Sequence, residues 1–169
     1  MGADIHMYVE RRMPSGDWAC VRDLNETLHS KGLNVLVRSS SPIKDGFSAF
    51  WDLVGRNYTL FAALAGVRGD GPQPRGLPQD VSEYVELERD GWGFDAHSVS
   101  WYSASDFVRI YEGVYAEVDD DTPLSEYVIT RMEDGDEIAV ARFLSDKVGV
   151  GLGNDDSVDD YRFVFWFDN

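Results

Sequence analysis

The sequence predicts an α+β fold with a mostly antiparallel sheet. Strand patterns gather at the two ends of the chain and helix patterns lie mainly in its second half, without a strict alternation of the two. The closing YRFVFWFDN (161–169) is apolar on both faces, which is typical of a central strand covered on both sides. Such a strand needs neighbours, and we expect the N-terminal hairpin to supply them. With no repeat and no long linker, we expect one domain over 1–169, packed by roughly three to five helices.

The hairpin is predicted from the first residues of the chain. DIHMYVERR (4–12) alternates apolar with polar residues, which indicates a half-buried strand with one polar face. PSGD (14–17) is a turn sequence, and WACVRD (18–23) is then the returning strand. LNVLVRS (33–39) is a third candidate strand.

Two helices are expected in the middle of the chain. RNYTLFAALAG (56–66) predicts a helix because Asn57 is a favourable N-cap, the apolar residues share one face and Gly66 supplies the stop. Asp80 can cap a second, short helix that Gly91 ends.

The second half adds a strand and further helices. FDAHSVSWY (94–102) is expected to be a strand, and Ser103 opens a helix with a capping-box-like sequence. Thr122 followed by Pro123 starts another helix, and EIAVARFLSDK (137–147) is expected to be helical too.

The net charge of −16, from 31 acidic and 15 basic residues, disfavours direct binding to nucleic acid or to an anionic membrane. Two interpretations remain. The acids form either a solvated surface, typical of a high-GC or salt-adapted host, or an acidic face that binds a basic partner protein in place of DNA.

The chain also lacks membrane and secretion signals. The longest apolar run, LFAALAGV (60–67), is far shorter than the roughly 20 residues that a membrane span needs. No secretory signal pattern opens the chain, and Cys20 is its only cysteine, so an intramolecular disulfide is impossible. We expect a soluble protein in the cytoplasm of the host cell.

Five segments, taken together, resemble a family of small proteins encoded by bacteriophages and prophages: DIHMYVE, RNYTLFAALAGVR, RGLPQD, DAHSVSW and VFWFDN. That family has no established activity. The resemblance therefore implies a phage or prophage accessory protein and assigns no catalytic residue. The stretch 103–160 carries none of the family's sequences.

Two Asp-x-His pairs are the first candidates for chemistry. Residues two apart on a strand share a face, so Asp4 projects with His6 and Asp95 with His97. If the two strands were neighbours, these four side chains and Asp168 could bind Zn²⁺ or Mn²⁺, or serve in acid–base catalysis. The alternative is that both histidines make structural hydrogen bonds. No HxH or HExxH motif supports the metal, so we expect no cofactor, with a divalent metal as the alternative.

The glycine- and proline-rich loop 66–80 is the second candidate. Arg68 and Arg75 lie in it, and guanidinium groups with free backbone N–H groups suit phosphate or carboxylate ligands. The loop matches no phosphate-binding motif, so the alternative is a surface loop whose arginines pair with nearby acids.

Other patterns carry weaker indications. GVGLGNDDSVDD (149–160) resembles one calcium-binding repeat, but a single copy fails the required spacing, and we expect acidic turns. Cys20 has no histidine near it in sequence, and Ser98 is expected to face away from His97, so nucleophilic catalysis finds no support. Trp51 and Trp92 are either core residues or exposed anchors of an interface.

Three functions follow from these patterns. The first is an accessory protein that binds a basic host or phage protein, such as an inhibitor of a host-defence or nucleic-acid-handling protein. It predicts acids concentrated on one face. The second is a small divalent-metal-dependent hydrolase or nucleotide-processing enzyme centred on His6 and His97. The third is a protein that binds an anionic nucleotide through the loop 66–80.

Overall fold

The computed structural model describes residues 2–24, 54–115 and 137–168. The strand predicted at 33–39, the helix predicted from Thr122 and Trp51 lie outside these ranges. The four strands of the sheet follow the order β2-β1-β4-β3, and every neighbouring pair is antiparallel. The predicted α+β fold is therefore confirmed, with four α-helices among the described residues.

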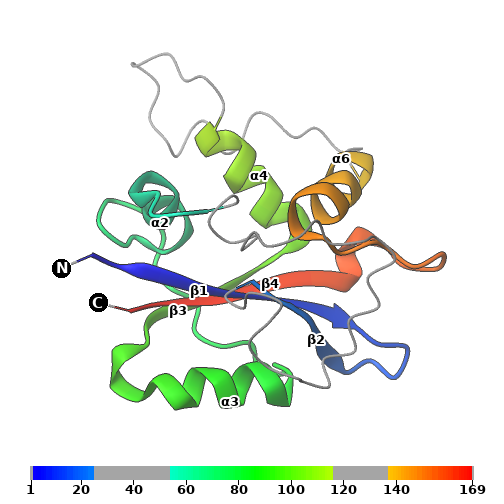
Figure 1. The fold of residues 1–169 in the computed structure, drawn as a ribbon, viewed down its shortest axis with the longest axis horizontal. Helices are drawn as coiled ribbons and strands as arrows, with labels where there is room; N and C mark the ends of the chain where they lie inside the picture. The colour runs from blue at the N-terminus through cyan, green and yellow to red at the C-terminus, as the bar shows by residue number, and fades with distance from the viewer. Residues whose placement is uncertain (1, 25–53, 116–136, 169) are drawn as a thin grey trace.

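The two ends of the chain form the centre of the sheet (Figure 1). β1 (Asp4–Arg12) and β4 (Tyr161–Asp168) pair along their whole length, and β2 (Trp18–Asp23) and β3 (His97–Ser103) form the edges. Every residue of 161–167 is buried. The prediction that the closing strand is covered on both sides, with the N-terminal hairpin beside it, is confirmed.

Three helices cover one face of the sheet, where the phenylalanines of β4 point. They are α2 (Tyr58–Ala65), α4 (Ala104–Tyr115) and α6 (Glu137–Phe143), the last continuing as a π-helical turn over 144–148. The predicted start and stop of α2 are confirmed, because Asn57 Oδ1 accepts a 3.0 Å hydrogen bond from the Leu60 N–H and Gly66 adopts a left-handed φ of 65°.

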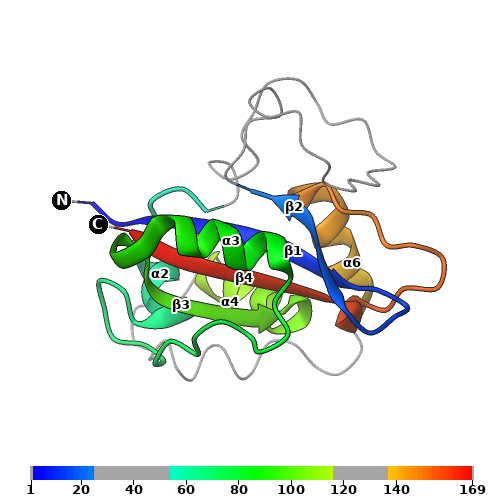
Figure 2. The same ribbon diagram turned by 90° about the horizontal axis from the view of Figure 1, so that it is seen from below.

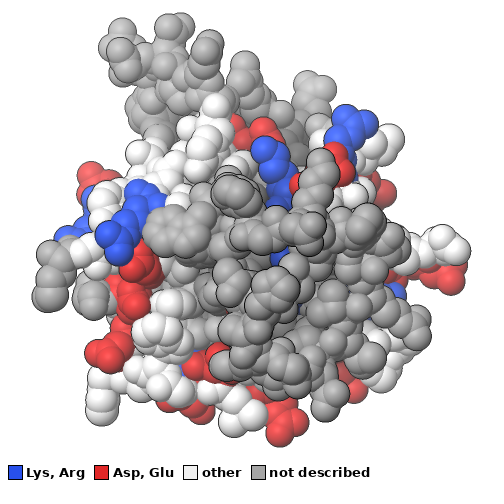
Figure 3. Space-filling view, in the orientation of Figure 1, with Lys and Arg blue, Asp and Glu red and all other residues white. Residues whose placement is uncertain are grey.

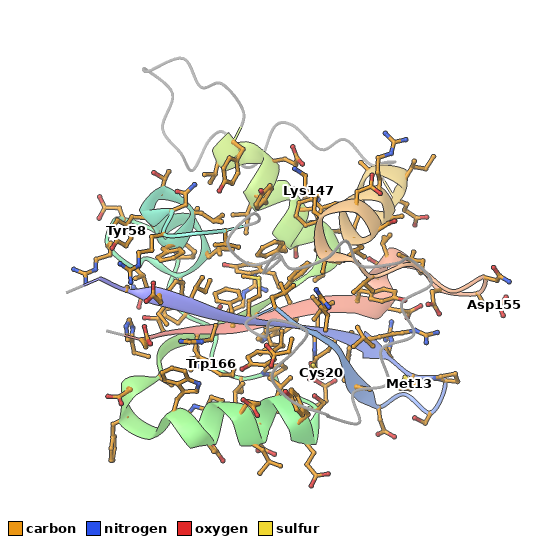
Figure 4. The ribbon with its side chains drawn as sticks, in the orientation of Figure 1. Met13, Cys20, Tyr58, Lys147, Asp155 and Trp166 are labelled. Atoms are coloured by element: carbon orange, nitrogen blue, oxygen red, sulfur yellow. The ribbon has the colours of Figure 1, made fainter. Side chains whose placement is uncertain are left out.

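A single helix covers the other face (Figure 2). α3 (Glu83–Trp92), followed by a 3₁₀ turn η1 (Gly93–Asp95), packs on Tyr8 of β1 and on Trp166, which Figure 4 shows between the sheet and the helix. The prediction that β1 has one polar face is wrong, since Tyr8 and Glu10 on that face are both buried.

The capping prediction for this helix is also wrong. Ser82 occupies the N-cap position of α3, while the Asp80 carboxylate accepts hydrogen bonds from Arg162 and Trp18 instead. The helix ends at Trp92, one residue beyond the predicted stop at Gly91, with Gly93 as its C-cap. Within the described residues, none of the helices is both long and apolar enough to cross a membrane.

The loop 66–80 packs on the C-terminal end of α2, most closely at Gly71. A Cβ atom there would lie 1.9 Å from the carbonyl oxygen of Ala62, and that oxygen already accepts the capping hydrogen bond from the Gly66 N–H. We expect Gly71→Ala to lower the free energy of unfolding by about 1–3 kcal/mol, because backbone must move to admit the methyl group. Urea denaturation measures the change.

Gly91→Ala is the matched control, since a Cβ at Gly91 has no heavy atom within 4 Å. It should not lower the free energy of unfolding, and we expect a gain of up to about 1 kcal/mol, because alanine is the better helix former. Equal stability of Gly71→Ala and the wild type would contradict the close approach.

Candidate functional site

The first Asp-x-His pair lies where the two ends of the chain meet. In the β1–β4 register Asp4 is opposite Asp168, and His6 is opposite Trp166. His6 Nε2 lies 3.2 Å from Asp168 Oδ2, and Asp168 Oδ1 accepts a 3.1 Å hydrogen bond from the Asp4 N–H. Three of the five candidate metal ligands are therefore neighbours.

Two of these side chains, those of Asp4 and His6, also contact residues outside this group. Arg56 donates to both carboxylate oxygens of Asp4, at 2.6 and 2.9 Å, and these hydrogen bonds hold the pKa of Asp4 below its usual value. The ring of Trp92 lies against that of His6, with centroids 4.0 Å apart. Asp4 thus acts as the anchor of Arg56, which precedes α2.

The second pair does not join the first, because the condition for a shared site, that β1 and β3 be neighbours, is not met. β4 lies between β1 and β3, and His97 is opposite Phe167, whereas His6 is opposite Trp166. Neighbouring residues of a strand point to opposite faces, so the two histidines do too. Asp95 is exposed in η1 rather than on the strand. No three His, Cys, Asp or Glu side chains in 2–24, 54–115 and 137–168 are grouped so that they could hold a metal ion.

His97 instead contacts its neighbour Ser98, with Nδ1 3.1 Å from Oγ, which corrects the expectation that the two face apart. Ser98 has a φ of 51°, and the pairing register shifts between His97 and Ser100, so the regular alternation of a strand is lost there. Cys20 is buried, and this burial raises the pKa of its thiol, which keeps it protonated and unreactive.

The two loop arginines take separate positions. Arg75 lies along the edge strand β3, where its Nη1 donates to the Trp101 carbonyl oxygen at 3.3 Å and its Cζ lies 4.1 Å from the centroid of the Tyr102 ring. Arg68 lies beside α2, with Cζ 5.9 Å from the ring centroid of Tyr58. Arg75 therefore holds the loop 66–80 on the sheet.

An ionic network, buried at Arg162 and Glu10 and exposed at Asp80, joins this loop to the centre of the sheet, and the sequence did not suggest it. Arg162 donates to Glu10 Oε2 and to Asp80 Oδ1, each at 2.6 Å, and its guanidinium lies 3.9 Å from the ring centroid of Trp18. Glu10 also accepts a 2.8 Å hydrogen bond from the Ser82 N–H, just before α3. The one signal in the sequence was a lone arginine in the otherwise apolar strand YRFVFWF.

The acids of 149–160 are used within turns, as predicted. Asp156 accepts hydrogen bonds from Arg11 Nη2, from the Tyr161 hydroxyl at 2.6 Å and from the Gly153 N–H at 2.8 Å. Ser157 caps the short turn η3 (Val158–Asp160), which leads into β4. This loop therefore orients the start of the central strand.

Asp156 should make the stability of the protein depend on pH. Burial acts to raise its pKa, but the hydrogen bonds from Tyr161 and Arg11 outweigh burial, and the pKa is below the ordinary 3.8. Its stabilising contribution is then fully present above the unfolded pKa and is lost as the pH falls through the lower, folded pKa. The melting temperature of Asp156→Asn should consequently fall less than that of the wild type between about pH 6 and about pH 2.

Asp155→Asn is the control, because Figure 4 places the exposed Asp155 at the tip of the same loop. Its melting curve should follow the wild type at every pH. A parallel decline of Asp156→Asn and the wild type would contradict the assignment.

The outer side of α3 carries a group of acidic residues. Residues 80–95 contain six acids and one arginine. Figure 3 shows acidic side chains along the lower edge, where Figure 1 places α3, while the larger basic areas lie in the upper half. We call the exposed side chains of residues 83–95 the α3 surface: Glu83, Glu86, Leu87, Asp90, Phe94 and Asp95.

The inner side of α3 is anchored on the sheet. Val85 on the inner side of the helix is fully buried, and the Tyr84 hydroxyl donates a 3.1 Å hydrogen bond to Asp23 of β2. At the other end of α3, Trp92 is half-buried against His6. His6 of the first Asp-x-His pair thus supports this surface, and a partner would meet a shape that needs little ordering.

Comparison with known proteins does not assign the chain to a group: no family model, no curated protein and no solved structure matches it.

Proposed function

We propose that this chain is a phage or prophage accessory protein that binds a basic protein through the α3 surface, in the place of nucleic acid. The observation that carries the proposal is the grouping of six acids against one arginine in 80–95. Four of these acids, Glu83, Glu86, Glu88 and Asp90, lie on α3, which covers the outer side of the sheet. A partner that normally binds DNA or RNA, such as a host-defence or nucleic-acid-handling protein, offers the complementary positive surface.

The remaining candidates for chemistry support binding rather than catalysis. Asp4 is paired with Arg56, and Arg75 lies on the backbone and rings of β3. Asp4 and Arg75, which the sequence offered as a metal ligand and an anion contact, thus contribute to the packing of the fold. The α3 acids point to solvent, where they are available to a partner.

The test is capture of partners from a nuclease-treated bacterial lysate with three versions of the chain. The first is the wild type, and the second carries Glu83→Gln, Glu86→Gln and Asp90→Asn in the α3 surface. The third is a matched control with the same change of charge on the opposite side of the sheet: Glu112→Gln, Glu137→Gln and Asp146→Asn. These three control acids are also exposed, and Glu137, like Glu83, lies in the first turn of its helix.

We expect a protein that the wild type and the control retain, that the α3 variant loses, and that duplex DNA displaces. The affinity of that purified protein should fall as the salt concentration rises, because salt screens exposed charges beyond about 10 Å at 0.1 M. Equal capture by all three versions, or capture that DNA does not disturb, would refute the proposal.

A further inference from the structure

Two large apolar side chains stand exposed within the acidic α3 surface. Leu87 is 64% exposed, and Phe94 is fully exposed. Leu87 follows the buried Val85 by two positions, which are about 200° apart around a helix, so Leu87 points away from the sheet. Gly91 lies between them in sequence, and a Cβ there would meet nothing within 4 Å. The surface at Gly91 is therefore open.

The position of Phe94 is set by the residues before it. Gly93 has a φ of 55°, a left-handed value that side chains rarely adopt, and it turns the chain out of α3 directly after Trp92. Trp92 is itself held against His6. The exposed ring therefore follows a turn fixed on the sheet, and its placement costs little conformational entropy on binding.

The charge around this apolar pair decides what can cover it. A second copy of the chain would bring a second acidic surface against the first, and like charges in an interface cost several kcal/mol. An anionic membrane is repelled for the same reason. A basic surface with apolar side chains at its centre is complementary to both the acids and the two apolar residues.

On the basis of the proposed function, we infer that the partner presents a basic amphipathic helix, whose apolar side chains pack on Leu87 and Phe94 while its lysines and arginines meet the surrounding acids. Interfaces commonly place their strongest contact at a central aromatic residue with a polar rim. Amphipathic helices are recognised through apolar residues three, four and seven positions apart.

The experiment uses two synthetic helical peptides of equal positive charge as probes. One peptide has leucines three and four positions apart, so that they share one face of a helix, and lysines on the opposite face. The other has glutamine at every leucine position. Binding to the full chain is measured by fluorescence anisotropy. We expect the Lys/Leu peptide to bind at least about 10-fold more tightly than the Lys/Gln peptide.

Two variants locate that difference. Leu87→Ala with Phe94→Ala should abolish the preference for the Lys/Leu peptide and leave Lys/Gln binding unchanged. Ile138→Ala is the matched control, because Ile138 is 72% exposed on α6, and it should keep the preference. Both variants change only exposed side chains, so their melting temperatures should stay near that of the wild type.

The outcomes separate this inference from the proposed function. If both peptides bind the wild type equally and both are weakened by the charge variant of the α3 surface, the acidic site stands and the apolar contact is refuted. A preference for the Lys/Leu peptide that survives in the double alanine variant also refutes it. If neither peptide depends on the α3 acids, the proposed function fails as well.

Discussion

Replacement of Arg162 by methionine is expected to lower the free energy of unfolding by about 3–5 kcal/mol. Glu10 is 0% exposed, and Arg162 is the cation that donates to it at 2.6 Å. Without that cation, a buried carboxylate is left uncompensated, and its loss of hydration is no longer offset. Equilibrium unfolding in urea at neutral pH measures the change.

Two controls separate the network from the loss of a surface charge. Arg12→Met removes an exposed ion pair with Asp160 from the neighbouring part of β1 and should cost about 0–1 kcal/mol. The double variant Glu10→Gln with Arg162→Met should be more stable than Arg162→Met alone, because the buried charge is then gone. Equal losses for Arg12→Met and Arg162→Met would show that the Arg162 network stabilises the fold no more than an exposed ion pair does.

Phe163→Ala is the second change with a large expected effect, about 3–5 kcal/mol. Phe163 is fully buried in β4, and its ring stacks on that of Phe107 in α4 with centroids 4.0 Å apart. Its cross-strand neighbours are Val9 in β1 and Tyr102 in β3. The cavity would therefore open at the centre of the sheet, beneath a helix, where the surroundings cannot easily collapse.

Phe94→Ala is the control for the loss of an aromatic ring. Phe94 is fully exposed, so its removal should change the free energy of unfolding by less than about 0.5 kcal/mol. Phe163→Leu, which keeps most of the volume, should lie between the two. A loss below about 1 kcal/mol for Phe163→Ala would contradict the central position of β4.

The sequence predicted those parts of the fold whose signals are local. The alternation in β1, the apolar run of β4 and the ends of α2 at Asn57 and Gly66 can each be identified from a few neighbouring residues. Pairing of the first and last strands followed because a strand apolar on both faces must lie between neighbours.

The errors arose where distant residues decide the outcome. Glu10 was expected to face water, but Arg162 and the Ser82 N–H, which come from far along the chain, satisfy it in the interior. Asp80 was expected to cap a helix, but it accepts a hydrogen bond from the same arginine. The His97 side chain contacts that of Ser98 because the strand register shifts there, and no residue type in this segment predicts that shift.

The candidate site shows the same division. The two Asp-x-His pairs could be recognised in the sequence, but their separation depends on β4 lying between their strands. The net charge of −16 was equally apparent, whereas the grouping of acids around Leu87 and Phe94 depends on which side of α3 faces the sheet. The resemblance to phage proteins stays a prediction.

The central position of β1 and β4 also determines when the protein can fold. Asp4 pairs with Asp168, so the two middle strands are separated by nearly all of the sequence between them. Without β4, β1 would keep only β2 as a neighbour in the described sheet, and β3 would have no strand to join there. Contacts that span almost the whole polypeptide are slow to form, because a long loop must close before any of them contributes. We therefore expect the pairing of β1 with β4 to be the slow step in forming the sheet.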